Sequence, residues 1–87
     1  MKMIILIIKD SEADALTRAL TSEDYRVTRI ASTGGFLRSG VATLLLGVGD
    51  TQVDSATKLI RETIAMGAPT EKIASLFVVP VERFEQV

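Results

Sequence analysis

The chain has 87 residues and a mass of 9.4 kDa, and we expect residues 1–87 to form a single domain. Ten basic and eleven acidic residues give a formal net charge of −1, which argues against a nucleic-acid polymer as the partner. Cysteine and histidine are both absent, which excludes disulfides, Cys/His metal sites and catalysis by a nucleophile–histidine pair.

The apolar content is high for so short a chain. Hydrophobic residues make up 47% of the sequence, so we expect a partner to cover part of the apolar surface. The longest apolar run near the start covers residues 3–8, whereas a membrane-spanning helix needs about 20 residues. We therefore expect a soluble, cytoplasmic protein without a membrane partner.

The first half of the chain predicts two strands around a helix. Residues 2–8 are apolar at every position after the lysine, which is typical of a strand buried on both faces. A helix follows, with Asp10 or Ser11 as its cap, and we expect it to end near Glu23. Residues 25–31 predict the second strand.

The second half repeats this pattern. Residues 41–48 predict a third strand that pairs with the second as an antiparallel hairpin. Thr51 and Asp54 resemble the capping box of a second helix, which we expect to stop at Gly67. Residues 75–79 predict the last strand.

The resulting order, βαββαβ, predicts an α+β, ferredoxin-like fold in which two helices cover one face of a four-stranded antiparallel sheet. In the first strand Ile4, Leu6 and Ile8 point to one face, while Ile5 and Ile7 point to the other. Two helices cannot cover both faces, so we expect an oligomer whose sheets face one another. The alternative is that the C-terminal residues fold back over the second face.

Basic charge is concentrated in one part of the sequence. Residues 25–49 contain Arg26, Arg29 and Arg38 but no acidic residue, which favours a small anionic ligand. The other explanation is that strands are generally poor in Asp and Glu. The carboxylates elsewhere offer no catalytic pair, because Asp10, Asp50 and Asp54 are all explained as helix starts, and we expect no enzymatic activity.

A glycine-containing turn lies inside this acid-free segment. Ser32-Thr33-Gly34-Gly35 can turn backbone N–H groups toward a phosphate, and Phe36 beside it can stack on a base. An ordinary glycine turn with Phe36 in a subunit interface explains the same residues, so both interpretations stay open.

Residues 26–40, 47–48 and 76–81, with their Thr-Gly-Gly-Phe-Leu-x-Ser-Gly core, resemble the hallmark segments of the PII-like cyclic di-AMP receptor family. The resemblance implies a non-enzymatic signalling protein whose ferredoxin-like subunits form a homotrimer. It implies cyclic di-AMP or a related adenine nucleotide as the ligand, bound in clefts between subunits, with no other cofactor and with a downstream protein of unknown identity. The implied ligand contacts are Arg26, Thr28, Gly35, Phe36, Leu37, Gly47, Phe77 and Gln86.

The chain departs from the family pattern at two places. Val41 stands where family members usually have asparagine, and residues 67–72 replace a long loop before the last strand. In the family this loop is a ligand-responsive element. The alternative function is therefore a structural or interaction trimer that has lost nucleotide binding.

Overall fold

One antiparallel sheet organises the part of the chain that the structure describes. The structure is a computed structural model that describes residues 1–30, 40–67 and 74–87. Its strands lie in the order β2-β3-β1-β4, and each is antiparallel to its neighbours. Their bounds are Lys2–Lys9 (β1), Val27–Ile30 (β2), Val41–Val48 (β3) and Ala74–Pro80 (β4).

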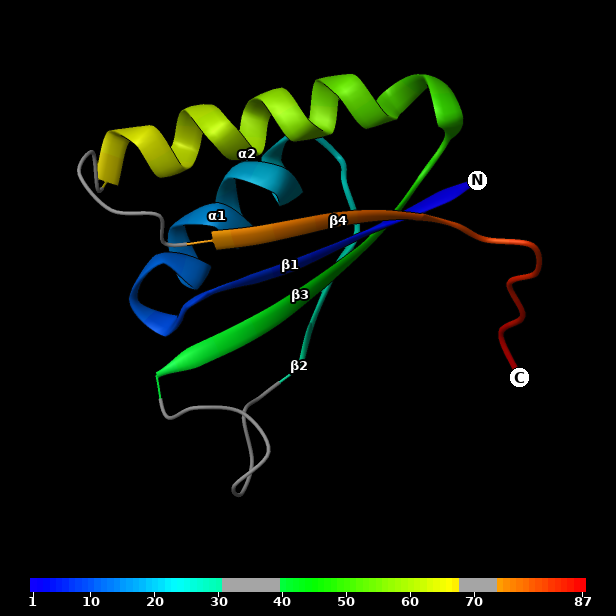
Figure 1. Cartoon of the computed structure of the whole chain (residues 1–87), viewed down its shortest axis with the longest axis horizontal. Coiled ribbons are helices and arrows are strands. Elements are labelled where there is room, and N and C mark those ends of the chain that lie inside the picture. Colours follow the sequence, from blue (N-terminus) through cyan, green and yellow to red (C-terminus); the bar gives the residue numbers. More distant parts are fainter. Residues whose placement is uncertain (31–39, 68–73) are drawn as a thin grey trace.

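Both helices lie on the same face of this sheet, as predicted. Helix α1 spans Asp10–Ser22 and α2 spans Val53–Gly67 (Figure 1). A short 3-10 turn, Asp50–Gln52, leads into α2. Together with the strand order, these positions confirm the ferredoxin-like βαββαβ fold.

The hydrophobic core fills the space between the helices and the sheet. Alternate residues of each inner strand point into it, because side chains of a strand alternate between its two faces. Leu6 of β1, for example, is fully buried and lies in register between Leu44 of β3 and Leu76 of β4. The buried residues are Ile4, Leu6, Ile8, Ala13, Leu16, Leu20, Ala42, Leu44, Leu46, Val48, Ala56 and Ile60.

The helix starts differ from the sequence predictions. Helix α1 begins at Asp10, with Lys9 at the cap position and no side-chain cap hydrogen bond, so the predicted caps Asp10 and Ser11 are wrong. Before α2, the side-chain Oε1 of Gln52 accepts a hydrogen bond from the backbone N–H of Gly49, with an N to O distance of 2.9 Å. The 3-10 turn thus begins before Thr51. The predicted capping box of Thr51 and Asp54 is wrong, and the hydrogen bond between Gly49 and Gln52 takes its place.

Strand β2 is shorter than the predicted residues 25–31. Asp24 adopts a left-handed backbone, with φ 67°, and the N–H of Tyr25 bonds to the carbonyl of Leu20 at the end of α1 at 3.0 Å. That N–H is bonded to the end of the helix rather than to a strand, and pairing with β3 starts at Val27. Ala31 lies outside the described residues.

Candidate functional site

The second face of the sheet is not covered by a helix and carries most of the described candidate residues. We call it the open face. One row of register partners crosses it, from Thr28 on β2 through Leu45 on β3 and Ile5 on β1 to Phe77 on β4. The centre of the row is apolar and half-buried, whereas the ring of Phe77 is 51% exposed. The predicted two-faced character of β1 is therefore confirmed.

A second row lies next to the first, toward the end of the sheet where the chain termini lie. Gly47 on β3 is in register with Met3 on β1, which is in register with Val79 on β4. A Cβ built on Gly47 would lie 3.2 Å from the Cε atom of Met1, so backbone is exposed here beside a flexible side chain. Sequence reasoning missed Met3, although its odd position in β1 places it on the face of Ile5.

Arg26 lies at the β2 edge of the open face. It directly precedes Val27, whose register partner is Leu46, the neighbour of Gly47. Thr28 is two residues further along, within β2, and faces the open side. Arg26 is exposed, and within the described residues it takes part in no salt bridge. Its guanidinium is thus available for an anion.

Arg29, by contrast, does not point to the open face. Its Nη1 donates to Asp14 Oδ1 at 2.6 Å and its Nη2 donates to Asp10 Oδ1 at 3.2 Å, both on α1. These hydrogen bonds, first the one that Arg29 donates to Asp14 and then the one to Asp10, raise the pKa of Arg29 above its ordinary value. The sequence counted Arg29 among the charges that attract a ligand, but its charge is offset by α1. The i, i+4 spacing of Asp10 and Asp14 places them on one face of α1, but no sequence pattern indicates that Arg29 lies opposite them.

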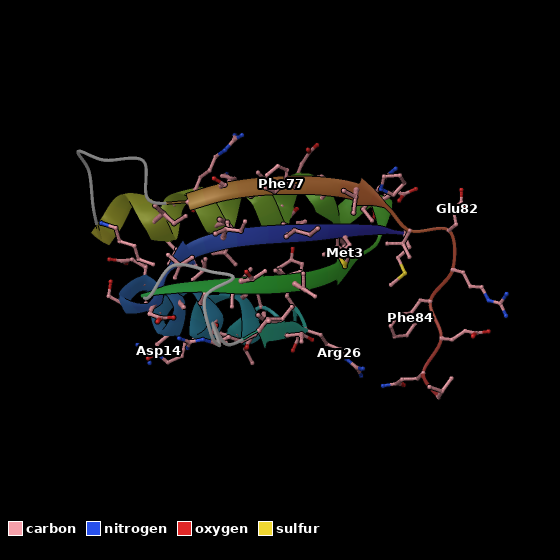
Figure 2. The ribbon with its side chains drawn as sticks, turned by 60° about the horizontal axis from the view of Figure 1, so that its bottom comes forward. Met3, Asp14, Arg26, Phe77, Glu82 and Phe84 are labelled. Atoms are coloured by element: carbon pink, nitrogen blue, oxygen red, sulfur yellow. The ribbon has the colours of Figure 1, made fainter. Side chains whose placement is uncertain are left out.

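Two of the candidate residues lie at opposite edges of the sheet. Thr28 is on β2 and Phe77 is on β4, and Figure 2 shows Arg26 and Phe77 at opposite sides of the sheet. Three strand spacings separate these edges, a distance of about 14 Å. A single chain therefore does not bring the arginine edge and the phenylalanine edge together.

The C-terminal residues leave the sheet beside the N-terminus of the chain. The N–H of Val81 donates to the carbonyl of Met1 at 3.1 Å, and the following residues extend away from the strands (Figures 1 and 2). Phe84 is 66% exposed, and Gln86 is exposed as well. The tail thus does not cover the open face in the described structure, contrary to the alternative that the sequence left open.

Three predicted contacts, Gly35, Phe36 and Leu37, lie outside the described residues, as does Arg38. Across the described ranges, no cluster of three or more acidic side chains is suited to hold a metal ion. Among the helices of the described residues, none is long and apolar enough to cross a membrane.

Fold and site together define a ferredoxin-like α+β protein with an exposed, arginine-edged sheet face. The sequence model of the cyclic-di-AMP receptor family matches residues 1–69, and the chain belongs to this family. The match includes the candidates from Arg26 to Gly47 and ends before Phe77 and Gln86. The fold is also similar to the crystal structure of a functionally unknown protein from Pediococcus pentosaceus ATCC 25745. The TM-score is 0.77 at 26% identity, over 99% of this chain and 96% of the other.

Proposed function

We propose that the protein is a non-enzymatic, PII-like signalling receptor. It binds cyclic di-AMP or a related adenine nucleotide in clefts between the subunits of a homotrimer and passes the signal to a downstream protein. The observation that carries this proposal is membership of the cyclic-di-AMP receptor family across residues 1–69.

The chemistry of the open face supports a nucleotide ligand. Arg26 and Thr28 share the β2 edge and can donate to one phosphate group, which an exposed guanidinium binds through charge-assisted hydrogen bonds. Gly47 lets a ligand approach the backbone closely, and the half-exposed ring of Phe77 offers an apolar surface for an adenine. Gly35, Phe36, Leu37 and Gln86 are the remaining proposed contacts.

The separation of the two edges supports clefts between subunits. Because Thr28 and Phe77 lie about 14 Å apart across one sheet, a ligand can touch both kinds of edge more readily where the β2 edge of one copy meets the β4 edge of another. Assembly with sheets facing inward also covers Leu45 and Ile5, which a single chain leaves half-buried.

A structural trimer without a nucleotide is the second candidate function. It is favoured by Val41, which starts β3 on the open face with an apolar side chain, and by the short connection over residues 67–72. The two candidates differ in one measurable property, because only the receptor binds nucleotide.

The test is isothermal titration of the protein with cyclic di-AMP, cyclic di-GMP, ATP and AMP. We expect the adenine nucleotides to bind. If none of the four nucleotides gives a heat of binding, the receptor proposal is refuted and the structural trimer is favoured. Arg26→Ala removes the proposed phosphate contact, and loss of a hydrogen bond to a charged group, about 1.5–3 kcal/mol, weakens binding by roughly 10- to 150-fold. Arg18→Ala, at an exposed position of α1, is the matched control and keeps wild-type affinity.

A further inference from the structure

The N-terminal part of α1 contacts the chain on both sides of segment 31–39, on which the proposed contacts Gly35, Phe36 and Leu37 lie. On one side, the carboxylates of Asp10 and Asp14 accept hydrogen bonds from Arg29 of β2. On the other side, the backbone N–H of Asp10 donates to the carbonyl of Gly40, directly before β3, at 2.7 Å. Asp10 therefore contacts both flanks of the segment.

Strand β2 needs such support because it is short and lies at the edge of the sheet. It spans only Val27–Ile30 and pairs with β3 alone within the described structure. Arg29 reaches toward the helices, while its neighbours Thr28 and Ile30 face the open side. The hydrogen bonds between Arg29 and α1 lie on the helix side of the sheet. They thus fix the position of the neighbouring Thr28, although α1 does not contact the open face.

The other flank is defined by the backbone. Gly40 has φ +85°, a backbone conformation that residues other than glycine rarely adopt. It leads directly into Val41 at the start of β3. The hydrogen bond from Asp10 sets the position of this turn. The two flanks of segment 31–39 are therefore positioned by the N-terminal part of the same helix.

We infer that Asp10, Asp14 and Arg29 form a clamp that positions the ligand-binding hairpin. None of the three is a ligand contact; they act through Thr28 and through the two flanks of segment 31–39. This inference rests on the proposed function. All three side chains are exposed, and exposed ion pairs contribute little to global stability. The clamp therefore affects ligand affinity more than unfolding.

The test compares neutral variants by cyclic di-AMP titration and by thermal unfolding. Arg29→Gln and Asp14→Asn each weaken affinity by roughly 2- to 5-fold, the range that exposed ion pairs can supply. The double variant is no weaker than Arg29→Gln alone, because that substitution already removes the contacts of Arg29 with both Asp14 and Asp10. Lys58→Gln, which breaks the exposed Lys58–Glu62 pair on α2, is the control for loss of an ion pair. The clamp variants and this control change the unfolding temperature equally little.

A direct ligand contact by Arg29 would give a different pattern. Arg29→Gln would then lose affinity while Asp14→Asn, which frees the guanidinium, would keep or increase it, and that result would overturn the clamp. Equal losses of affinity and thermal stability, relative to the Lys58→Gln control, would also overturn it.

Hydrogen exchange separates failure of the clamp from failure of the proposed function. In the unliganded protein, Arg29→Gln speeds amide exchange in peptides that cover β2 and the start of β3 but leaves β4 unchanged. If the wild type binds no nucleotide, the receptor proposal fails while this readout still decides the clamp. Unchanged exchange in β2 would refute the clamp, whatever the ligand.

Discussion

Replacing Ile5 by glutamate tests whether the open face is an assembly surface. Ile5 lies at the centre of that face, between Leu45 and Phe77, and its side chain points away from the core residues Ile4 and Leu6. In a separated chain the glutamate reaches water, so the fold is retained at a loss of about 1 kcal/mol in strand propensity. Between two facing sheets, the same carboxylate is desolvated.

The size of the effect follows from this burial. Loss of the isoleucine contact costs about 1.5–3 kcal/mol if its side chain is covered by a second copy. Desolvation of the carboxylate adds several kcal/mol per ion by general estimate, so the association constant falls by at least roughly 1,000-fold per interface. At micromolar concentration Ile5→Glu is expected to separate into single chains that keep their secondary structure.

Light scattering and circular dichroism measure these two outcomes together. We expect a three-chain mass for the wild type and a one-chain mass with a near wild-type spectrum for Ile5→Glu. Thr21→Glu, at an exposed position of α1, is the control and keeps the assembly. A wild-type mass for Ile5→Glu, or a one-chain mass for the wild type, would show that the open face is not an interface.

Three further substitutions address the core, the glycine on the open face and the start of α2. Leu6→Ala leaves a cavity at a fully buried position and lowers the free energy of unfolding by about 3 kcal/mol, or roughly 12–24 °C in Tm by calorimetry. Gly47→Ala keeps or raises the Tm, because the exposed Met1 side chain can move, but it weakens nucleotide binding in titration. The hydrogen bond from the Met1 amino group lowers the pKa of Asp50 below 3.8. The stabilisation by this hydrogen bond is therefore present above pH 3.8 and is lost as the pH falls through the lowered pKa of Asp50. Asp50→Asn should thus be less stable than wild type at neutral pH and equally stable in strong acid, by denaturant unfolding.

Each of these expectations has a specific contradictory outcome. A Tm change below a few degrees for Leu6→Ala would mean that the core rearranges around the missing side chain. Unchanged affinity for Gly47→Ala would place the ligand away from this row of the sheet. A difference between wild type and Asp50→Asn that persists in strong acid would assign the effect to packing, and Asp54→Asn in the first turn of α2 is the control for helix-start charge.

The two faces of the sheet could be predicted because strand side chains alternate with a period of two. That rule predicted that Leu6 and Ile5 point to opposite faces of the sheet, and it put Arg26 and Thr28 on one face of the second strand. The bounds of β3 were also predicted correctly, since Gly40 and Gly49 flank a run of mostly β-branched and apolar residues that only Gly47 interrupts.

The remaining features depend on contacts between distant segments. Nothing local to Arg29 indicates that α1 lies against it, so its charge was assigned to the ligand. Strand β2 starts only after the turn in which Tyr25 bonds to Leu20, and the distance between Thr28 and Phe77 follows only from the strand order. The positions that sequence patterns missed are those set by tertiary packing.

The edge position of β4 also governs the solubility of separated chains. Residues 74–80 contain no charged side chain, and Phe77 and Val78 are both more than two-fifths exposed on opposite faces of the strand. Edge strands usually carry lysine or another charged residue that prevents edge-to-edge aggregation, and here only Pro80 interrupts pairing. Chains kept apart by dilution or by substitution therefore expose an aggregation-prone segment. The proposed assembly, in which the β4 edge of one copy meets the β2 edge of another, would cover this segment.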